Sequence, residues 1–405
     1  MNRMKPFKAL ITFEEAKRRI LENTPKVERT EFVDLREAHG RVLASTLKAN
    51  LDIPGFRRAA MDGYAVRAED TYGAARLTPK RLNAIGSVFT GQISDAEVKE
   101  QQCIQIATGA PMPDGADAVV MVEETSSSGT EIDIFKPVYP GANVSSANAD
   151  MAKGDEVLQI GSLLTPARVG VLAALGLTRV EVFARPKVAI FPTGEEIIEP
   201  GNEIEFGKVY DINSYTLASL LESSGAEVEI RPIAGDSMDD LRKCIHLASE
   251  RGSDYAIFSG GSSVGERDLL VDVLRELGDV LFHGIALKPG KPTLFGKVGG
   301  TLVFGMPGYP TSCLTNAYVL LLPSIRRMAG LPSNTRTEEH ILTQRLVSTI
   351  GRHQLYPVRI EDGKAIPAFK ESGAITSMSR ATGWIEIPHN TEFVEEGTTV
   401  TVHYF

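Results

Sequence analysis

The sequence predicts a multidomain protein with α/β and β-rich parts, organised around a doubly wound α/β domain. From Pro186 onward, short apolar β-prone runs alternate with helical segments, which is typical of a parallel sheet covered on both faces. Residues 81–135 contain short β-like runs broken by Gly and Pro, which indicates a small β-rich domain. A chain of 405 residues has room for about two to four domains with cores of their own.

Composition excludes several classes of function. The formal net charge of -9 argues against a nucleic-acid-binding surface, so an anionic ligand would have to meet a local group of cations. The three cysteines and seven histidines do not cluster at metal-ligand spacings, which argues against a zinc site. The N-terminus lacks a signal-peptide apolar region, and no run of about 20 apolar residues occurs. We therefore expect a cytoplasmic protein that binds neither nucleic acid nor a membrane.

Helix-capping residues indicate where helices begin in the N-terminal part of the chain. Thr12 and Glu15 form a potential capping box for a helix over 12–24. Residues 35–48 predict a short helix or turn followed by an extended piece. Thr165 and the proline after it start a helix over about 167–175. Arg185-Pro186 predicts a domain boundary.

Two turn-rich stretches lie in or beside the β-rich block. In 51–67, Asp62 stands on a glycine turn near Arg57 and Arg58, an arrangement that suits either a ligand contact or a closed hairpin. In 106–117, the Thr108 hydroxyl suits either a ligand or a turn cap. The residues alone leave both alternatives open.

The α/β part follows in order. Strands are predicted at 188–191, 228–232, 254–258, 280–282 and 301–304, and helices at 213–224, 237–250, 269–277 and from 311. Asn213 or Ser214 is the expected N-cap of the first of these helices, and Ser237 with Asp240 caps the second.

Ser259 to Asp268 reads Ser-Gly-Gly-Ser-Ser-Val-Gly-Glu-Arg-Asp and lies between a buried strand and a helix. Glycines permit close approach of the backbone, while hydroxyls, N–H groups and the helix dipole favour an anion. The stretch is neither a Walker loop nor a GxGxxG motif. A tight βα turn whose glycines serve only geometry is the competing interpretation.

Ligands of open α/β sheets bind outside the carboxyl ends of the strands, so the strand-exit loops should share one rim. These loops are Thr193–Glu196, Asp236, Ser259–Asp268, Lys288–Lys291 and Pro307–Pro310. Carboxylates alone would repel a phosphate, so we expect them to hold a hard divalent cation such as Mg²⁺ that bridges to it. Lys288 and Lys291 would neutralise oxyanion charge directly. Taken alone, Asp236 fits a helix-capping turn better.

Six motifs in order give the chain a family resemblance. They are Ala60–Arg67 (AMDGYAVR), Ala107–Asp117 (ATGAPMPDGAD), Pro192–Glu196 (PTGEE), Ser259–Gly265 (SGGSSVG), Lys288–Pro292 (KPGKP) and Met306–Pro310 (MPGYP). With these motifs the chain resembles the MoeA family of molybdopterin molybdenumtransferases, which also includes a domain of gephyrin. The resemblance covers essentially the whole chain.

The resemblance implies insertion of molybdate into adenylylated molybdopterin with Mg²⁺, releasing AMP. It implies a homodimer whose active site is shared between subunits, a pterin substrate, and a contact with the molybdopterin adenylyltransferase. It also implies four domains: a discontinuous linker domain, a β-rich inserted domain, the α/β molybdopterin-binding domain and a small C-terminal β-barrel. Their ranges are 1–50 with 146–184, 51–145, 185–330 and 331–405. The predicted β-barrel over 331–405 agrees with short strands predicted at 355–360, 384–387 and 399–402.

Site residues are carried over from the same resemblance. The catalytic set comprises Asp62, Thr108, Glu196, Asp236 and Asp268, and the last three of these are the expected Mg²⁺ ligands. Asp62 and Thr108 would act from the partner subunit. The set expected to bind the pterin substrate comprises Thr193, Gly194, Ser259, Gly260, Gly261, Ser262, Ser263, Gly265, Lys288, Lys291, Pro307, Pro310, Asp150 and Ser379.

The chain departs from the family pattern at several positions. Residues 141–150 contain no arginine where the family often has several, Ser262 replaces a usual valine, and Tyr309 replaces a usual asparagine. These departures leave open a tungstate-selective paralogue or a non-catalytic molybdopterin-binding or scaffold protein. A molybdopterin adenylyltransferase is a third alternative, although the four-domain layout argues against it.

Overall fold

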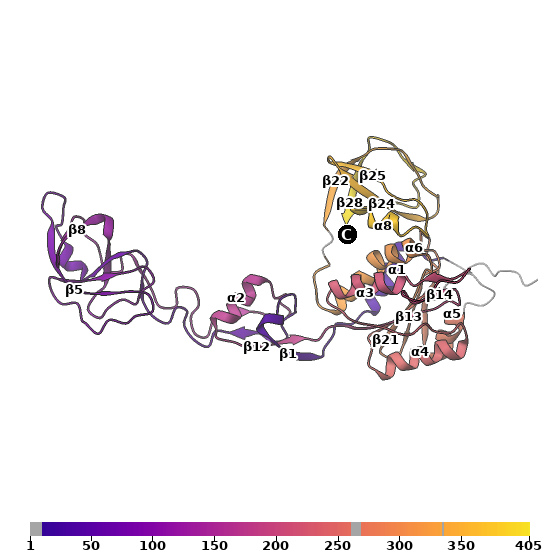
Figure 1. The fold of residues 1–405 in the computed structure, drawn as a ribbon, viewed down its shortest axis with the longest axis horizontal. Coiled ribbons are helices and arrows are strands. Elements are labelled where there is room, and N and C mark those ends of the chain that lie inside the picture. The colour runs from indigo at the N-terminus through magenta and orange to yellow at the C-terminus, as the bar shows by residue number, and fades with distance from the viewer. Residues whose placement is uncertain (1–9, 261–268, 334–335) are drawn as a thin grey trace, which may run out of the picture. The chain divides into compact units, whose positions relative to one another are not determined.

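The structure is a computed structural model that describes residues 10–260, 269–333 and 336–405 (Figure 1). These residues form two compact units. The first contains the N-terminal segment up to Glu31, Gly40–Val42 and Val182–Phe405; the second contains Phe32–His39 and Leu43–Glu181. The boundaries of the four predicted domains stay a prediction.

The first unit contains a six-stranded sheet of the α/β type. In spatial order its strands are β16 Glu227–Ile230, β13 Lys187–Pro192, β17 Tyr255–Ser259, β21 Thr301–Met306, β20 Leu294–Val298 and β18 Asp279–His283. The first four run parallel, as predicted. The prediction of a parallel sheet was incomplete, because it contained no strand at the position of β20, which pairs antiparallel with both of its neighbours. Gly299-Gly300 turns the chain tightly from β20 into β21, so no crossover helix is needed there.

Helices cover both faces of this sheet, which confirms the doubly wound prediction. One face packs on α1 Phe13–Asn23, α3 Asn213–Ser223, and the continuous run of α6 Pro310–Asn316, the π-helical η4 Ala317–Leu321 and α7 Leu322–Met328. The other packs on α4 Met238–Glu250 and α5 Leu269–Leu277 (Figure 1). Alternation along β17 explains this: Tyr255 and Ile257 enter the first core, and Ala256 and Phe258 the second.

Helix starts agree with the sequence only in part. Thr12 caps α1 by accepting the Glu15 N–H, but the Glu15 carboxylate binds Arg18 and Arg19. The hydrogen bonds from these two arginines are the main cause that lowers the pKa of the Glu15 carboxyl to about 2. The expected caps of α3 were wrong. Its first helical residue is already Asn213, and the Asp211 side chain accepts the Ser214 N–H because that carboxylate reaches the open first turn. Ser237 caps α4 as predicted.

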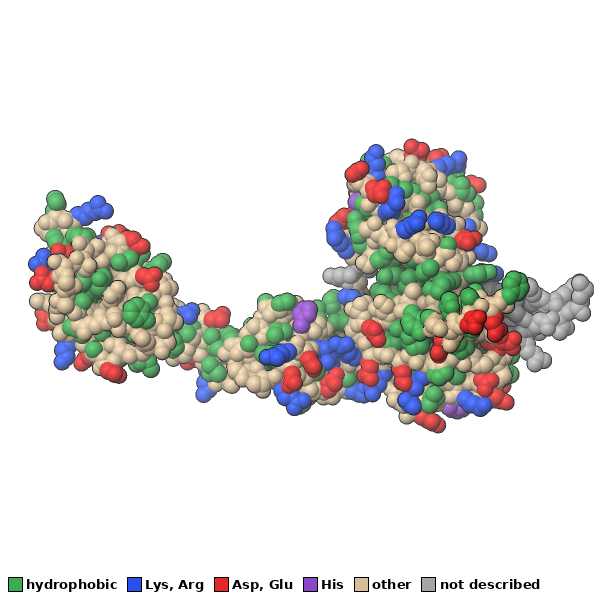
Figure 2. Space-filling model, in the orientation of Figure 1, with side chains coloured by type: hydrophobic (Ala, Val, Ile, Leu, Met, Phe, Trp, Pro, Cys, Tyr) green, Lys and Arg blue, Asp and Glu red, His purple; other side chains and the backbone are tan. Residues whose placement is uncertain are grey.

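The C-terminal strands close into a small barrel, which confirms the prediction. The ring is β24 His353–Glu361, β25 Lys364–Pro367, β22 Thr337–Leu342, β28 Thr399–Tyr404 and β26 Gly383–Ile387, with β26 pairing back to β24. β19 Leu287–Lys288 adds to β24. Leu355 and Trp384 share a core with α1 and the α/β sheet, and Figure 2 shows hydrophobic side chains along this boundary. The barrel is therefore docked on the α/β part of the same unit.

The second unit contains the predicted β-rich sheet. Its order is β7 Ala118–Met121, β4 Gly63–Val66, β6 Gln102–Ile106, β5 Lys80–Val88, β9 Glu131–Ile134 and β8 Thr125–Ser128. Separate hydrophobic clusters cover its two faces. The Cβ of any side chain at Gly63 would lie 1.9 Å from the Val120 carbonyl oxygen, so only glycine fits directly after Asp62.

The remaining elements are short. They are the helices α2 Pro166–Ala174 and α8 Thr376–Ser379, the 3₁₀ turns η1 Leu35–Glu37, η2 Ala68–Thr71 and η3 Val122–Glu124, and the strands β1 Thr30–Asp34, β2 Leu47–Lys48, β3 Arg58–Ala59, β10 Val144–Ser145, β11 Glu156–Leu158, β12 Arg179–Phe183, β14 Ile197–Ile198, β15 Val209–Tyr210, β23 Leu346–Val347 and β27 Phe393–Val394. Within the described ranges, none of the helices has the length and apolar character needed to span a bilayer.

The α/β core supplies a stability prediction. Phe304 is fully buried in β21, with its ring 4.7 Å from that of Phe295. We expect Phe304→Ala to destabilise this unit by about 3–5 kcal/mol, because it removes buried area and leaves a cavity. Phe206→Ala is the matched control; its ring is fully exposed, and the change should stay within about 0.5 kcal/mol. Urea denaturation followed by circular dichroism measures both, and equal midpoints would contradict the core assignment.

Candidate active site

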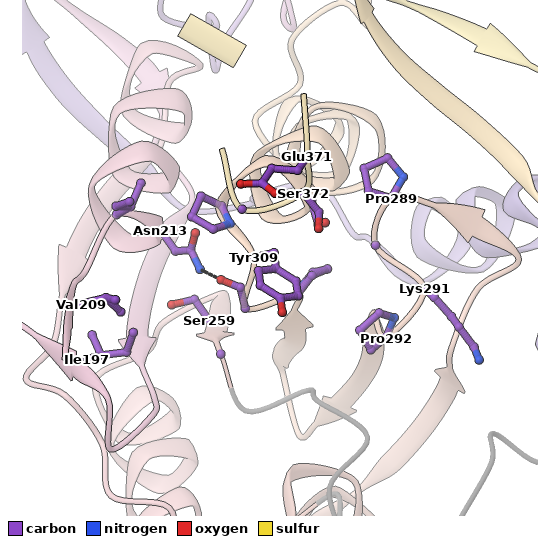
Figure 3. A pocket seen from close by; sticks show the side chains of 18 of the residues that line it. Ile197, Val209, Asn213, Ser259, Pro289, Lys291, Pro292, Tyr309, Glu371 and Ser372 are labelled. Atoms are coloured by element: carbon purple, nitrogen blue, oxygen red, sulfur yellow. Dashed lines mark hydrogen bonds between the residues drawn. The ribbon is translucent and has the colours of Figure 1, made fainter. Parts of the chain in front are cut away.

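A cavity of about 1040 Å³ lies at the carboxyl ends of β13, β17 and β21 in the first unit (Figure 3). Several residues predicted for the site line it together: Glu196, Ser259, Gly260, Lys288, Lys291, Pro307 and Pro310. They come from four separate strand-exit loops. The parallel register explains their meeting, since Pro192, Ser259 and Met306 are aligned at the ends of neighbouring strands.

Glycines allow the loops of β17 and β21 to touch. Gly260 has a φ of +117°, and a Cβ there would lie 2.1 Å from the Thr193 carbonyl oxygen. A Cβ at Gly308 would lie 3.5 Å from the Gly260 Cα. Thr193 is fully buried and donates from its N–H and its hydroxyl to the Ser259 carbonyl. It stands behind the cavity wall and supports the turn, whereas Ser259 and Gly260 face the cavity.

A pair of neighbouring carboxylates lies beside this turn. At Gly194 the φ is +133°, and a Cβ would lie 2.8 Å from a Glu196 carboxylate oxygen, so the glycine leaves room for that group. Burial raises the pKa of Asp236; the charges of Glu196 and Glu195 raise it further, and a hydrogen bond from the Glu195 backbone partly offsets this. Glu196 lines the cavity, while Asp236 and Gly194 do not.

These carboxylates fit the chemistry of a hard divalent cation. Mg²⁺ takes oxygen ligands and often uses one or two carboxylates together with substrate phosphates. Glu196 and Asp236 supply such oxygens. Asp268, the third expected ligand, lies outside the described residues, as do Gly261, Ser262, Ser263 and Gly265. Among the residues that are described, no group of three or more His, Cys, Asp or Glu could hold a metal.

Cationic side chains reach the cavity from two parts of the unit. Lys288, followed by a cis proline, donates from Nζ to the Thr349 hydroxyl at 3.0 Å. Lys291 is on the same loop, at the edge of the labelled group in Figure 3. Arg352 and Lys370 enter from the C-terminal barrel. The cavity can therefore meet an anion with several positive charges despite the acidic chain.

Sequence reasoning missed the residues that the barrel and α3 bring to the cavity. Phe369–Gly373 lies over the start of α6, where the Ser372 carbonyl accepts the Thr311 N–H at 3.1 Å. Asn213 donates from Nδ2 to the Gly308 carbonyl at 2.9 Å, as Figure 3 shows. Asn213 was interpreted only as a cap. The barrel residues lie far along the chain and carry no motif, so no local signal pointed to them.

Four expected site residues lie elsewhere in the fold. Ser379 ends α8, and its hydroxyl donates to the Thr376 carbonyl instead of lining the cavity. In the second unit, the Asp62 carboxylate accepts the Thr108 N–H at 2.7 Å, so these two predicted partners are neighbours. Asp150 is exposed in the same unit, and its N–H binds the Ile53 carbonyl.

Comparison with known families covers almost the whole chain. Residues 11–176 match the MoeA N-terminal region (domain I and II), residues 189–327 match a domain described as "Probable molybdopterin binding domain", and residues 340–405 match the MoeA C-terminal region (domain IV).

Individual proteins agree with the family matches. The chain is 32% identical to the molybdopterin molybdenumtransferase of Haemophilus influenzae, covering 98% of this chain and 99% of that protein. It is 34% identical to molybdopterin molybdenumtransferase 2 of Mycobacterium tuberculosis, over 91% and 94% of the two chains. A crystal structure of the molybdopterin biosynthesis MoeA protein from Pyrococcus horikoshii matches with a TM-score of 0.86 and 38% identity, covering 98% of this chain and 99% of that one.

Full-length relatives above 30% identity and the ordered domain matches lead to one conclusion. The chain belongs to the MoeA family.

Proposed function

We propose that this protein is a Mg²⁺-dependent molybdopterin molybdenumtransferase that inserts molybdate into adenylylated molybdopterin and releases AMP. The family assigns it to molybdenum cofactor biosynthesis. The observation that carries the finer proposal is the cavity in which a carboxylate, a glycine turn and cations from two directions meet. A pyrophosphate-linked pterin needs all three kinds of group, and the volume is sufficient for a ligand of that size.

Glu196, Asp236 and Asp268 would hold Mg²⁺, which when bound supplies positive charge that offsets the pyrophosphate and the leaving AMP. Ser259 and Gly260 present a hydroxyl and backbone groups to the cavity that Glu196 also lines, which suits them to orient the phosphates. Lys288, Arg352 and Lys370 would neutralise the anions as they enter. The burial of Thr193 behind the turn keeps the Ser259 carbonyl fixed.

The chemistry demands two changes in the substrates. The pyrophosphate bond must be hydrolysed, with water supplying the oxygen that separates AMP from the molybdopterin phosphate. The dithiolene sulfurs must displace oxygen ligands of molybdate, which leave as water with protons from the thiols and the solvent. Preorganised cations on the cavity wall stabilise the negative charge that develops in the first change.

The proposal includes a homodimer in which Asp62 and Thr108 of the partner subunit complete the site. Their hydrogen bond and their exposed position in the second unit suit a rigid acidic element that acts on a ligand held by another copy. It also includes a cytoplasmic location and a contact with the molybdopterin adenylyltransferase that would supply the substrate.

The first test supplies the purified protein with adenylylated molybdopterin, Mg²⁺ and either molybdate or tungstate, and follows AMP release. We expect release with molybdate, and loss of release after chelation with EDTA that returns on adding Mg²⁺. Release only with tungstate would identify a tungstate-selective paralogue. No release with either oxyanion, while the pterin still binds, would replace the proposal with a binding or scaffold function.

The metal role gives a second prediction. Glu196→Gln removes one anionic oxygen ligand while keeping the shape of the side chain. We expect the Mg²⁺ concentration for half-maximal AMP release to rise about tenfold or more, the scale of one interaction worth roughly 1.5–3 kcal/mol with a charged group. Glu199→Gln, on the neighbouring loop but outside the cavity lining, is the control. An unchanged Mg²⁺ dependence would remove Glu196 from the metal site.

The shared site gives a third prediction. Asp62→Asn keeps an oxygen that can accept the Thr108 N–H, so folding and melting temperature should be unchanged. Turnover should fall by roughly 10- to 100-fold, because one interaction of a charged group with the substrate or its cation is lost. Steady-state AMP release measures it. Turnover close to that of the unchanged protein would remove Asp62 from the mechanism.

A further inference from the structure

Tyr309 has the most exposed large hydrophobic side chain among the described residues that line the cavity. It is 66% exposed, although it lies between the β21 exit loop and α6, where the chain is otherwise well packed. In Figure 3 its ring lies in the middle of the labelled residues, near Ser259 and Ser372. Among the described residues, its hydroxyl makes no hydrogen bond. The ring therefore contributes little to the fold and presents its surface to the cavity.

Backbone contacts hold this residue in place from both sides. The Tyr309 carbonyl accepts the Cys313 N–H at 2.9 Å as α6 begins. The preceding Gly308 carbonyl accepts the Asn213 amide N–H at 2.9 Å. A fixed backbone limits the ring to few positions, which lowers the entropy that a ligand would lose on binding to it.

The neighbours of the ring leave it uncovered. A Cβ at Gly373 would lie 3.7 Å from the Tyr309 Cδ1, so this glycine stands beside the ring without a side chain. Gly308, the residue before it, also lacks a side chain and lies against Gly260. The aromatic surface is thus next to the turn proposed to hold phosphate.

We propose that Tyr309 is a specificity-determining residue whose ring stacks on the planar heterocycle of a phosphate-bearing ligand. The inference rests on the proposed function, because it names which part of the substrate this side of the cavity recognises. Stacking on an aromatic ring is tolerant of the identity of the heterocycle, since each has a π-face. The adenine and the pterin of the substrate share this chemistry, and the experiment separates them.

Isothermal titration calorimetry with AMP and, separately, with 6-hydroxymethylpterin tests the proposal. Tyr309→Ala should weaken binding of one of these probes by about 5- to 100-fold, the range for loss of one base–aromatic stack. Tyr309→Phe keeps the ring and should bind within about twofold of the unchanged protein. Tyr215→Ala is the matched control, because that tyrosine is 51% exposed on α3 but does not line the cavity.

The ultraviolet absorbance of the probe distinguishes stacking on the Tyr309 ring from a general change in the shape of the cavity. The ultraviolet absorbance of the stacked probe should decrease on binding to the unchanged protein and to Tyr309→Phe, but not to Tyr309→Ala. Equal affinities of Tyr309→Ala and the unchanged protein for both probes would overturn the proposal. Equal losses in the Phe and Ala variants would overturn it as well, because they would assign the effect to the hydroxyl. So would absence of binding of both probes to the unchanged protein.

The result is independent of the AMP-release assay. A protein that releases no AMP but binds one probe through the Tyr309 ring would refute the proposed reaction and keep this inference. A protein that releases AMP with Tyr309→Ala binding both probes normally would keep the reaction and refute the inference.

Discussion

The parallel pairing of β13, β17 and β21 is the constraint on which the candidate site depends. Hydrogen bonds align Pro192, Ser259 and Met306 at the same edge of the sheet, so the three following loops must leave side by side. Three polypeptide loops can share so small a space only if side chains are absent where they meet. Gly260 meets this requirement, because a Cβ at this residue would collide with the Thr193 carbonyl oxygen. The register of the sheet thus positions the turn at Ser259 and Gly260, and these two residues form part of the cavity surface.

Two cores hold this edge in position. The residues of β17 alternate between the cluster under α3 and α7 and the cluster under α4 and α5, so the central strand is clamped from both faces. Tyr255 is fully buried, and its hydroxyl shares a hydrogen bond with that of Ser324 in α7. Burial raises its pKa and keeps the phenol neutral. Because β17 is held in place from both faces, the loop that follows Ser259 begins at a fixed position.

The C-terminal barrel contributes to the site through its docking. Trp384 and Leu355 join the α/β core, and the Trp384 ring also stacks on His403 at 5.3 Å between centroids. This contact, with the pairing of β19 and β24, places Arg352 and the 369–373 segment at the cavity. The barrel is therefore both a stable element and one wall of the site. The barrel adds Arg352 and Lys370 to the cavity lining, which already contains Lys288 and Lys291 from the α/β part.

The sequence by itself determined the elements and the rim. Hydrophobic runs, caps such as Thr12 and Ser237, and the stop at Gly278 placed most α/β helices and strands, because these signals depend on residues close in the chain. The rule for parallel sheets then brought Glu196, Ser259 and Lys288 together correctly. Six ordered motifs were enough to identify the family.

Only the tertiary structure decided which distant residues complete the cavity. Local patterns could not reveal the antiparallel β20, because an apolar run does not state the direction of its partner. Nor could they place Arg352 and Lys370 in the cavity lining, or Gly373 beside the Tyr309 ring, since the barrel brings these residues there only when it docks. Thr193 shows the converse: its motif suggested a ligand contact, but packing placed its hydroxyl on the Ser259 carbonyl behind the wall. Sequence patterns fix local conformation, whereas strand pairing and side-chain surroundings follow from packing between segments far apart in the chain.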